Sequence, residues 1–199
     1  VFGLYYTYAV GELPAIDMIV TSNKKKESKM GIRLKSTLKE TDVALVAVDD
    51  KQLSMYGYEI EGDFNGMGWR SEAGLFKEKN QDITYQNSMF GVDYGFASGF
   101  MMIVEYYNRA KEISNIDKSY LGDTYIALNL SDTLTPLLSV NTVFMQNLED
   151  ESKFVGPSFT YSLSDEMTML LGALVGFGNE SSEFKRQGES YYFSWQASF

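Results

Sequence analysis

Apolar and polar residues alternate with a period of two along most of this chain, and clusters of Gly, Asn, Asp and Ser interrupt the alternation roughly every 12 to 18 residues. Successive side chains of a β-strand point to opposite faces, whereas a helix repeats every 3.6 residues, so the pattern is typical of strands. It predicts an all-β, antiparallel, up-and-down meander. The thirteen predicted strands cover residues 2–10, 15–22, 29–38, 42–48, 53–62, 66–77, 84–95, 99–108, 120–130, 134–146, 153–163, 167–177 and 190–199.

Composition narrows the classes of function. The 199 residues are treated as one domain, and no apolar run approaches the ~18 residues that a membrane-spanning helix requires. The chain has neither Cys nor His, which excludes thiol nucleophiles, imidazole metal ligands and the Ser-His-Asp triad. The net charge of -10 argues against a nucleic-acid partner. We therefore predict no enzyme activity, no cofactor and no metal.

The two faces of the predicted strands differ in a way that matters for their surroundings. Strand 66–77, for example, puts Met67 and Trp69 on one face and Arg70 and Glu72 on the other. Charges thus lie in the middle of strands, opposite an apolar face that carries aromatic rings near both strand ends. A membrane barrel has this arrangement, with lipid outside and a polar interior, whereas a small soluble barrel has an apolar interior.

The connections between strands alternate in length. Counted back from the C-terminus, "NESSEFKRQG" and "RAKEISNIDK" are long, while "SDE", "SD" and "AS" are short. Long connections therefore gather at one end of the sheet and short turns at the other. Outer-membrane barrels show this pattern, with short periplasmic turns and longer external loops.

The last strand carries a pattern that resembles a known family. Its alternating aromatic residues, Tyr191, Phe193, Trp195 and the final Phe199, resemble the terminal insertion signal of Gram-negative outer-membrane β-barrels. The stretches 91–108 and 150–178 are similar to porin-like barrels in their Gly-x-Asp-Tyr, Glu-Tyr and Tyr-Ser-Leu-Ser-Asp elements. The resemblance implies a transmembrane β-barrel that the barrel-assembly machinery inserts into the bacterial outer membrane, with the C-terminus on the periplasmic side.

Strand number yields a further expectation. Single-chain bacterial barrels normally have an even number of strands, and thirteen is odd. Either one strand boundary is misread or at least one N-terminal strand lies outside residues 1–199. We favour the second explanation and expect a parent barrel of fourteen or more strands.

Charged residues on the polar face predict the lining of the lumen. They are three cations and seven carboxylates, a net charge of -4, which predicts a weak preference for cations. The alternative is that these side chains form an ion-pair network that fills the interior. The predicted lumen and selectivity residues are Arg33, Lys35, Glu59, Glu61, Arg70, Glu72, Asp93, Glu105 and Asp123, and Asp17 is the seventh carboxylate.

A lysine run in an external connection suggests a second contact. Lys24, Lys25 and Lys26 could pair with lipopolysaccharide phosphates, because ammonium groups are attracted to anionic membrane surfaces. The alternative is a solvated loop that is kept soluble by its charge.

These features predict a porin-like channel for passive diffusion of small hydrophilic solutes or ions, with lipid and lipopolysaccharide as its surroundings. One alternative is a non-conducting barrel that acts as an anchor or as a subunit of an envelope complex. A second alternative is a soluble, lipocalin-like binding barrel, whose interior would be apolar. The predicted protein partners are the barrel-assembly machinery and either a homo-oligomer or an envelope complex.

Overall fold

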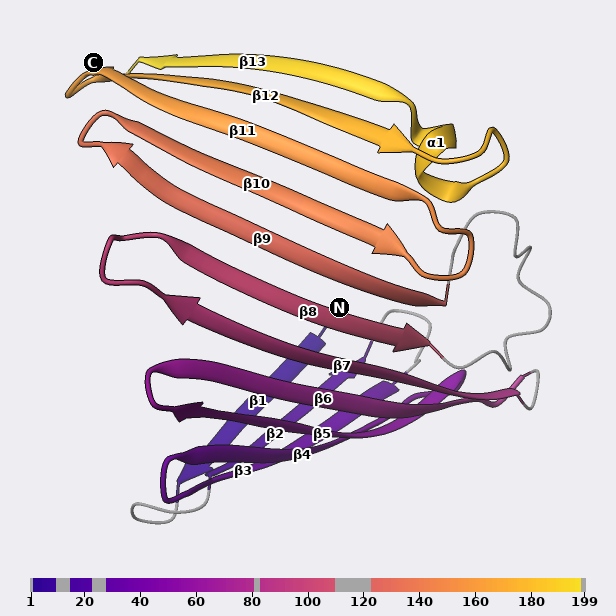
Figure 1. The fold of residues 1–199 in the computed structure, drawn as a ribbon. Helices are drawn as coiled ribbons and strands as arrows, with labels where there is room; N and C mark the ends of the chain where they lie inside the picture. The colour runs from indigo at the N-terminus through magenta and orange to yellow at the C-terminus, as the bar shows by residue number, and fades with distance from the viewer. Residues whose placement is uncertain (1, 10–14, 23–27, 81–82, 110–122, 198–199) are drawn as a thin grey trace. The chain divides into compact units, whose positions relative to one another are not determined.

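The computed structural model describes residues 2–9, 15–22, 28–80, 83–109 and 123–197. Within them thirteen strands form one antiparallel sheet in which every strand lies beside its neighbours in sequence, in the order β1 to β13 (Figure 1). The predicted all-β, up-and-down meander is therefore confirmed. Phe199 of the predicted insertion signal, and the predicted lipopolysaccharide contacts Lys24, Lys25 and Lys26, lie outside the described residues.

The strands fall into two compact parts of the chain. The first part comprises Val1–Phe90 and Tyr107–Ile116, and the second comprises Gly91–Tyr106 and Asp117–Phe199, so that the division crosses β7 and β8. The strands are β1 (Phe2–Ala9), β2 (Ala15–Ser22), β3 (Ser28–Leu38), β4 (Thr41–Asp49), β5 (Leu53–Phe64), β6 (Met67–Glu78), β7 (Ile83–Gly95), β8 (Met101–Arg109), β9 (Thr124–Thr135), β10 (Leu138–Asn147), β11 (Lys153–Ser164), β12 (Met167–Phe177) and β13 (Glu189–Ala197).

Tight turns join the strands at one end of the sheet. Asn65 and Gly66 between β5 and β6 both have positive φ, 53° and 78°, which is the type I′ geometry whose twist matches that of paired strands. The Gly66 N–H donates to the Asp63 carboxylate at 2.9 Å. The local sequence Asp-Phe-Asn-Gly therefore fixes this hairpin, as its composition predicts.

One predicted turn is wrong. The sequence suggested a break at Ser131 and Asp132, but β9 continues through both residues to Thr135, and the chain turns at residues 136 and 137. The Thr135 hydroxyl oxygen accepts hydrogen bonds from the N–H groups of Leu137 and Leu138, at 3.3 and 3.1 Å. The Thr-Pro pair thus supplies the turn, because Pro has no N–H to lose and its φ suits a turn.

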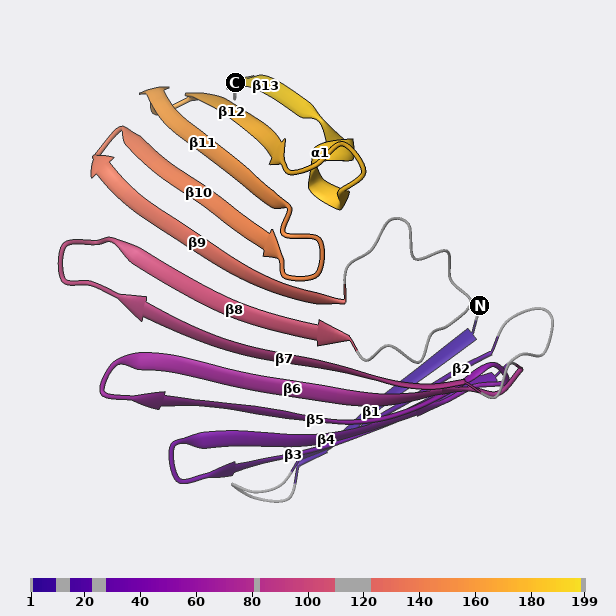
Figure 2. The same cartoon turned by 45° about the vertical axis from the view of Figure 1, so that its right-hand side comes forward.

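A short helix replaces part of a predicted loop. Helix α1 (Glu183–Gln187) lies in the connection between β12 and β13, next to the end of β12 in both views (Figures 1 and 2). The sequence prediction placed no element in "NESSEFKRQG". A helix of five residues is too short to produce a detectable apolar period.

Large apolar side chains are exposed along one face of the first part. Register places Leu34 opposite Leu45, and Leu45 opposite Tyr58, so these side chains share a face. Leu45 is 58% exposed, and Tyr56 and Phe64, on the same face of β5, are 63% and 65% exposed. We call this the apolar face of the first part.

The second part has a matching apolar face. Phe159 of β11 lies opposite Leu171 of β12, which lies opposite Phe193 of β13. Their exposed fractions are 43%, 56% and 61%, so the rest of this chain leaves the row largely uncovered. Among the residues that the structure describes, Ala44 and Phe184 are the only buried apolar side chains, so the apolar residues do not form an interior core.

Candidate functional site

Seven charged side chains share the opposite face of the first part, and we call them the charged strip. Register establishes this: Asp17 of β2 lies opposite Arg33 of β3, and Glu61 of β5 lies opposite Arg70 of β6. Directly opposite residues of antiparallel strands point to the same side of the sheet. The charged strip consists of Asp17, Arg33, Lys35, Glu59, Glu61, Arg70 and Glu72.

Two ion pairs cross the charged strip. The Arg33 guanidinium donates to the Glu59 carboxylate, and Lys35 Nζ lies 3.7 Å from Asp17 Oδ2. Arg33 and Glu59 lie on β3 and β5, so their contact passes over β4. There Ala44, which pairs with both Lys35 and Glu59, is only 4% exposed. A methyl group at this position leaves room for the Arg33–Glu59 pair above it.

Two carboxylates of the charged strip lie outside these pairs: Glu61 lies opposite Arg70, whereas Glu72 has no cation opposite it on β5. It lies directly opposite Glu59, and two like charges in such a position repel each other. Glu59 is balanced by Arg33, but Glu72 forms no hydrogen bond or ion pair with any residue that the structure describes. The charged strip therefore has a local excess of negative charge at Glu72.

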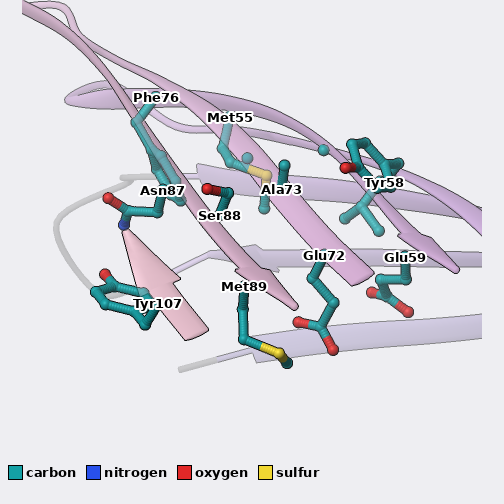
Figure 3. Close-up of a pocket in the computed structure, with 13 residues that line it drawn as sticks. Met55, Tyr58, Glu59, Glu72, Ala73, Phe76, Asn87, Ser88, Met89 and Tyr107 are labelled. Carbon is teal, nitrogen blue, oxygen red and sulfur yellow. The ribbon is translucent and has the colours of Figure 1, made fainter. Parts of the chain in front are cut away.

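A concavity of about 210 Å³ lies beside Glu72 and spans β4 to β8 within the first part. Figure 3 shows the Glu59 and Glu72 carboxylates side by side, with Met89 next to Glu72. We call this the Glu72 concavity. It is lined by Val46, Met55, Gly57, Tyr58, Glu59, Glu72, Ala73, Gly74, Phe76, Asn87, Ser88, Met89 and Tyr107.

Aromatic stacking and an unpaired amide lie at one side of the Glu72 concavity. Phe76 stacks on Tyr85 with ring centroids 5.0 Å apart and planes 6° apart, which fixes the Phe76 ring. Asn87 Oδ1 is buried and has no hydrogen-bond partner among the described residues. Buried carbonyl oxygens are normally bonded, so this amide is an exception that a ligand or water could satisfy.

Lysines and carboxylates also pair where strands meet their longer connections. Lys79 Nζ lies 2.6 Å from Asp49 Oδ1, and Lys29 Nζ lies 3.2 Å from Asp50 Oδ2. The pKa of the Asp50 carboxyl is lowered, first by hydrogen bonds from the N–H groups of Gln52 and Leu53 and then by Lys29. These ion pairs and hydrogen bonds hold the ends of the strands next to Asp49 and Asp50 in a defined geometry.

In the second part, α1 is bound to the connection between β10 and β11. The helix N-terminus receives its cap from Asp150, whose carboxylate accepts from the Glu183 N–H at 2.7 Å. Ser152 is 0% exposed, and its hydroxyl oxygen accepts a hydrogen bond from the Phe184 N–H at 3.3 Å. We call these residues, with Asn147, the α1 cluster.

The side chains of Glu183 and Phe184 complete the α1 cluster. Glu183 Oε2 accepts hydrogen bonds from Tyr125 Oη at 3.0 Å and from Asn147 Nδ2 at 2.8 Å. The Phe184 ring lies between Tyr125 and Phe154, with centroid distances of 6.3 and 5.9 Å. Strands and loop thus hold α1 on the same face as Asn147 and Phe154.

A burial effect and hydrogen bonds oppose each other at Asp150. Burial alone would raise the pKa of its carboxyl, but hydrogen bonds from the Ser152 hydroxyl and from the N–H groups of Glu183 and Ser152 lower it further than burial raises it. The net pKa of Asp150 is therefore below its usual value. Its charged form is the one that holds α1.

The remaining predicted site residues are more scattered. Asp93 lies on β7 and Glu105 on β8, both in the second part of the chain. Asp123 lies just before β9, which begins at Thr124, so its predicted position in the middle of a strand is wrong. The predicted strand 120–130 included Asp123, and its residues 120–122 lie outside the described residues.

The described residues of the predicted insertion signal share one exposed face of β13. Tyr191, Phe193 and Trp195 are 72%, 61% and 61% exposed, and they lie opposite Ala173, Leu171 and Met169 of β12. Their rings therefore continue the apolar face of the second part.

Sequence reasoning missed the two sites built from distant segments. The Glu72 concavity depends on Asn87 and Tyr107, and the α1 cluster depends on Asn147 and Ser152. A polar residue in a strand or turn carries no signal that shows which other segment it contacts.

Comparisons with protein-family models, with curated proteins and with solved structures find no match to this chain. No helix among the described residues combines the length and the apolar character needed to cross a membrane. Within the same residues, no three acidic side chains are grouped so that they could hold a metal ion.

Proposed function

We propose that this chain forms a β-barrel in the bacterial outer membrane and acts as a passive, porin-like channel for small hydrophilic solutes or ions. The supporting observation is the segregation of side chains between the two faces of the sheet. In the first part the row Leu34, Leu45 and Tyr58 is exposed on one face, and the charged strip occupies the other face. Water on both faces would leave the apolar rows without a partner.

Lipid accounts for this distribution better than a soluble barrel does. A lipocalin-like barrel requires apolar side chains in its interior, but Ala44 and Phe184 alone are buried apolar residues in the described part of the chain. In lipid, every strand edge must also be paired, which a sheet achieves by closing on itself. Under this proposal the tight turns are periplasmic and the connection that carries α1 is external.

The charged strip gives the channel its proposed selectivity. Arg33 with Glu59 and Lys35 with Asp17 form pairs whose charges largely cancel, and Glu72 remains uncompensated. A fixed carboxylate beside a water-filled path raises the local concentration of cations. A weak preference for cations follows.

Heat-dependent gel migration and bilayer conductance test this proposal. The refolded chain in detergent is expected to migrate differently before and after boiling, and to produce steps of current in planar bilayers. With a KCl gradient, the reversal potential is expected to show cation preference, and Glu72→Gln is expected to reduce it. Glu40→Gln, in the β3–β4 turn, removes the same charge elsewhere and serves as the control.

A non-conducting barrel is the second candidate, and two features favour it. Ion pairs cross the charged strip, and α1 packs on the face of the second part that carries Asn147 and Phe154, opposite the apolar face. Such a barrel would serve as an anchor or an envelope subunit. Heat-dependent migration without any conductance would support this candidate and refute the channel.

A further inference from the structure

The Glu72 concavity exists because two glycines face each other in the middle of two strands. Gly57 of β5 pairs with Gly74 of β6, between the pair Met55 and Phe76 on one side and Glu59 on the other. A Cβ at Gly57 would lie 2.7 Å from the Ala73 carbonyl oxygen, and one at Gly74 would lie 2.9 Å from the Phe76 ring. Because neither residue has a side chain, their backbone forms the floor of the hollow, and the larger side chains around them form its walls.

The walls have the chemistry of a site for a cation. None of the lining residues is Lys or Arg, whereas two are carboxylates. Because Glu59 is neutralised by Arg33 and Glu72 has no partner among the described residues, one full negative charge faces the hollow. A bound cation would relieve the repulsion between the opposed carboxylates.

Most of the lining is apolar, which distinguishes this hollow from a site for a hydrated metal ion. Met55, Phe76 and Met89 offer thioether and ring surfaces, and Phe76 is fixed by its stack on Tyr85. Small hard cations are held by several oxygens grouped around the ion, and the described residues contain no group of three acidic side chains that could hold a metal ion. An organic cation can place its ammonium group at Glu72 and its carbon skeleton on the apolar walls.

We infer that the Glu72 concavity binds an organic ammonium ion that carries an apolar or aromatic body. Apolar cavities of about 150 Å³ bind benzene, so a hollow of about 210 Å³ holds one ring and a short ammonium chain. Glu72 forms the ion pair with the ammonium group. Asn87, whose amide makes no hydrogen bond to the described residues, can turn its oxygen toward a second ammonium hydrogen.

The inference deepens the proposed function, because it names a ligand class for the polar face that the proposal assigns to the lumen. It rests on that proposal for the route by which a ligand enters. Binding itself is measured without a membrane potential, so the two ideas can fail separately.

Isothermal titration of the full chain, folded in detergent, with phenethylammonium chloride tests the inference. We expect saturable binding, and at least tenfold weaker binding of phenethyl alcohol, which has the same shape without the charge. Glu72→Gln is expected to weaken phenethylammonium binding at least tenfold, because a charged partner is replaced by a neutral one. Glu40→Gln serves as the matched control and is expected to bind like the parent chain.

A second variant protects the test from a folding failure. Asn87→Leu replaces an unsatisfied amide with an apolar group of similar size, so it is expected to fold and to weaken binding several-fold. Equal binding of the alcohol, unchanged binding by both variants, or equal loss in Glu40→Gln would overturn the inference. Conductance without binding would refute this inference alone, and binding without conductance would refute the channel alone.

Discussion

Replacing Gly176 with alanine should release α1 from the sheet. A Cβ at this position would lie 1.7 Å from the Phe184 carbonyl oxygen and 2.6 Å from its carbonyl carbon. Since side-chain carbons essentially never approach closer than 3.0 Å, the helix backbone must move by at least about 1.3 Å. The neighbouring atoms are backbone, so no rotamer change can relieve the contact.

The cost of this movement follows from the contacts of α1. Hydrogen bonds from the N–H groups of Glu183 and Phe184 to Asp150 and Ser152 have lengths of 2.7 and 3.3 Å and cannot all survive such a shift. A neutral hydrogen bond contributes about 0.5–1.5 kcal/mol and one to a charged group about 1.5–3 kcal/mol. Losing the hydrogen bond to the Asp150 carboxylate and the one to the Ser152 hydroxyl weakens the docking of α1 by roughly 2–4.5 kcal/mol.

Limited trypsin digestion measures this change, because Lys185 and Arg186 lie within α1. If cleavage proceeds through an undocked state, a loss of about 2 kcal/mol corresponds to a roughly 30-fold faster cut. Mass spectrometry identifies the fragments that end at these two residues.

Gly95→Ala provides the matched control. A Cβ at Gly95 meets no atom within 4 Å, so this variant is expected to be cut like the parent chain. Equal cleavage rates at α1 in Gly176→Ala and in the parent would refute the described packing.

Three further predictions concern packing, pH and the apolar face. Ala44→Leu puts a larger side chain under the Arg33–Glu59 ion pair. Urea unfolding is expected to show that this overpacking lowers the free energy of unfolding by about 1–3 kcal/mol. Because the pKa of Asp150 is lowered in the folded chain, its stabilising effect is complete well above the unfolded value of about 3.9, and it is lost as pH falls through the depressed value. The protection of α1 amides against exchange, relative to the intrinsic rate at the same pH, should therefore fall over that acidic range, and Asp150→Asn should abolish this dependence. Phe193→Lys should cost about 2–4 kcal/mol and reduce heat-dependent migration, whereas Ser194→Lys, on the other face, should not.

Outcomes that contradict these three predictions are equally concrete. Unchanged urea unfolding in Ala44→Leu would show that the space above this residue is not filled. Identical pH profiles for the parent and Asp150→Asn would remove the assigned role of that carboxylate. Equal effects of Phe193→Lys and Ser194→Lys would show that the two faces of β13 do not differ in their surroundings.

The sequence alone was sufficient for the order of the strands and for their faces, since both depend on a local period. Alternation assigned Leu34 and Arg33 to opposite faces of β3, and register confirms it. The limits of this reasoning appear at strand ends, where turn-forming residues do not always end a strand. At Ser131 and Asp132, two turn-forming residues suggested a break, but pairing with Asn141 and Val140 holds them in β9.

The candidate sites were only partly accessible to the same reasoning. Charges such as Glu59 and Glu72 could be assigned to one face, because each is fixed by the period of its own strand. Their different states could not be predicted, since Arg33 reaches Glu59 across an intervening strand and no residue reaches Glu72. That last statement applies to the described residues. Contacts of this kind depend on register, which a single strand does not reveal.

The ion pair that passes over β4 links three positions that are distant in the chain. Residue 44 of β4 lies opposite Glu59 and is buried, so Arg33 can reach Glu59 across β4 only while residue 44 stays small. Substitutions at these three positions are therefore expected to be correlated during evolution. Among relatives of this chain, we expect a bulky residue at position 44 to occur together with the loss of Arg33 or Glu59, and this correlated pattern would reveal the pairing of β3, β4 and β5 without a structure.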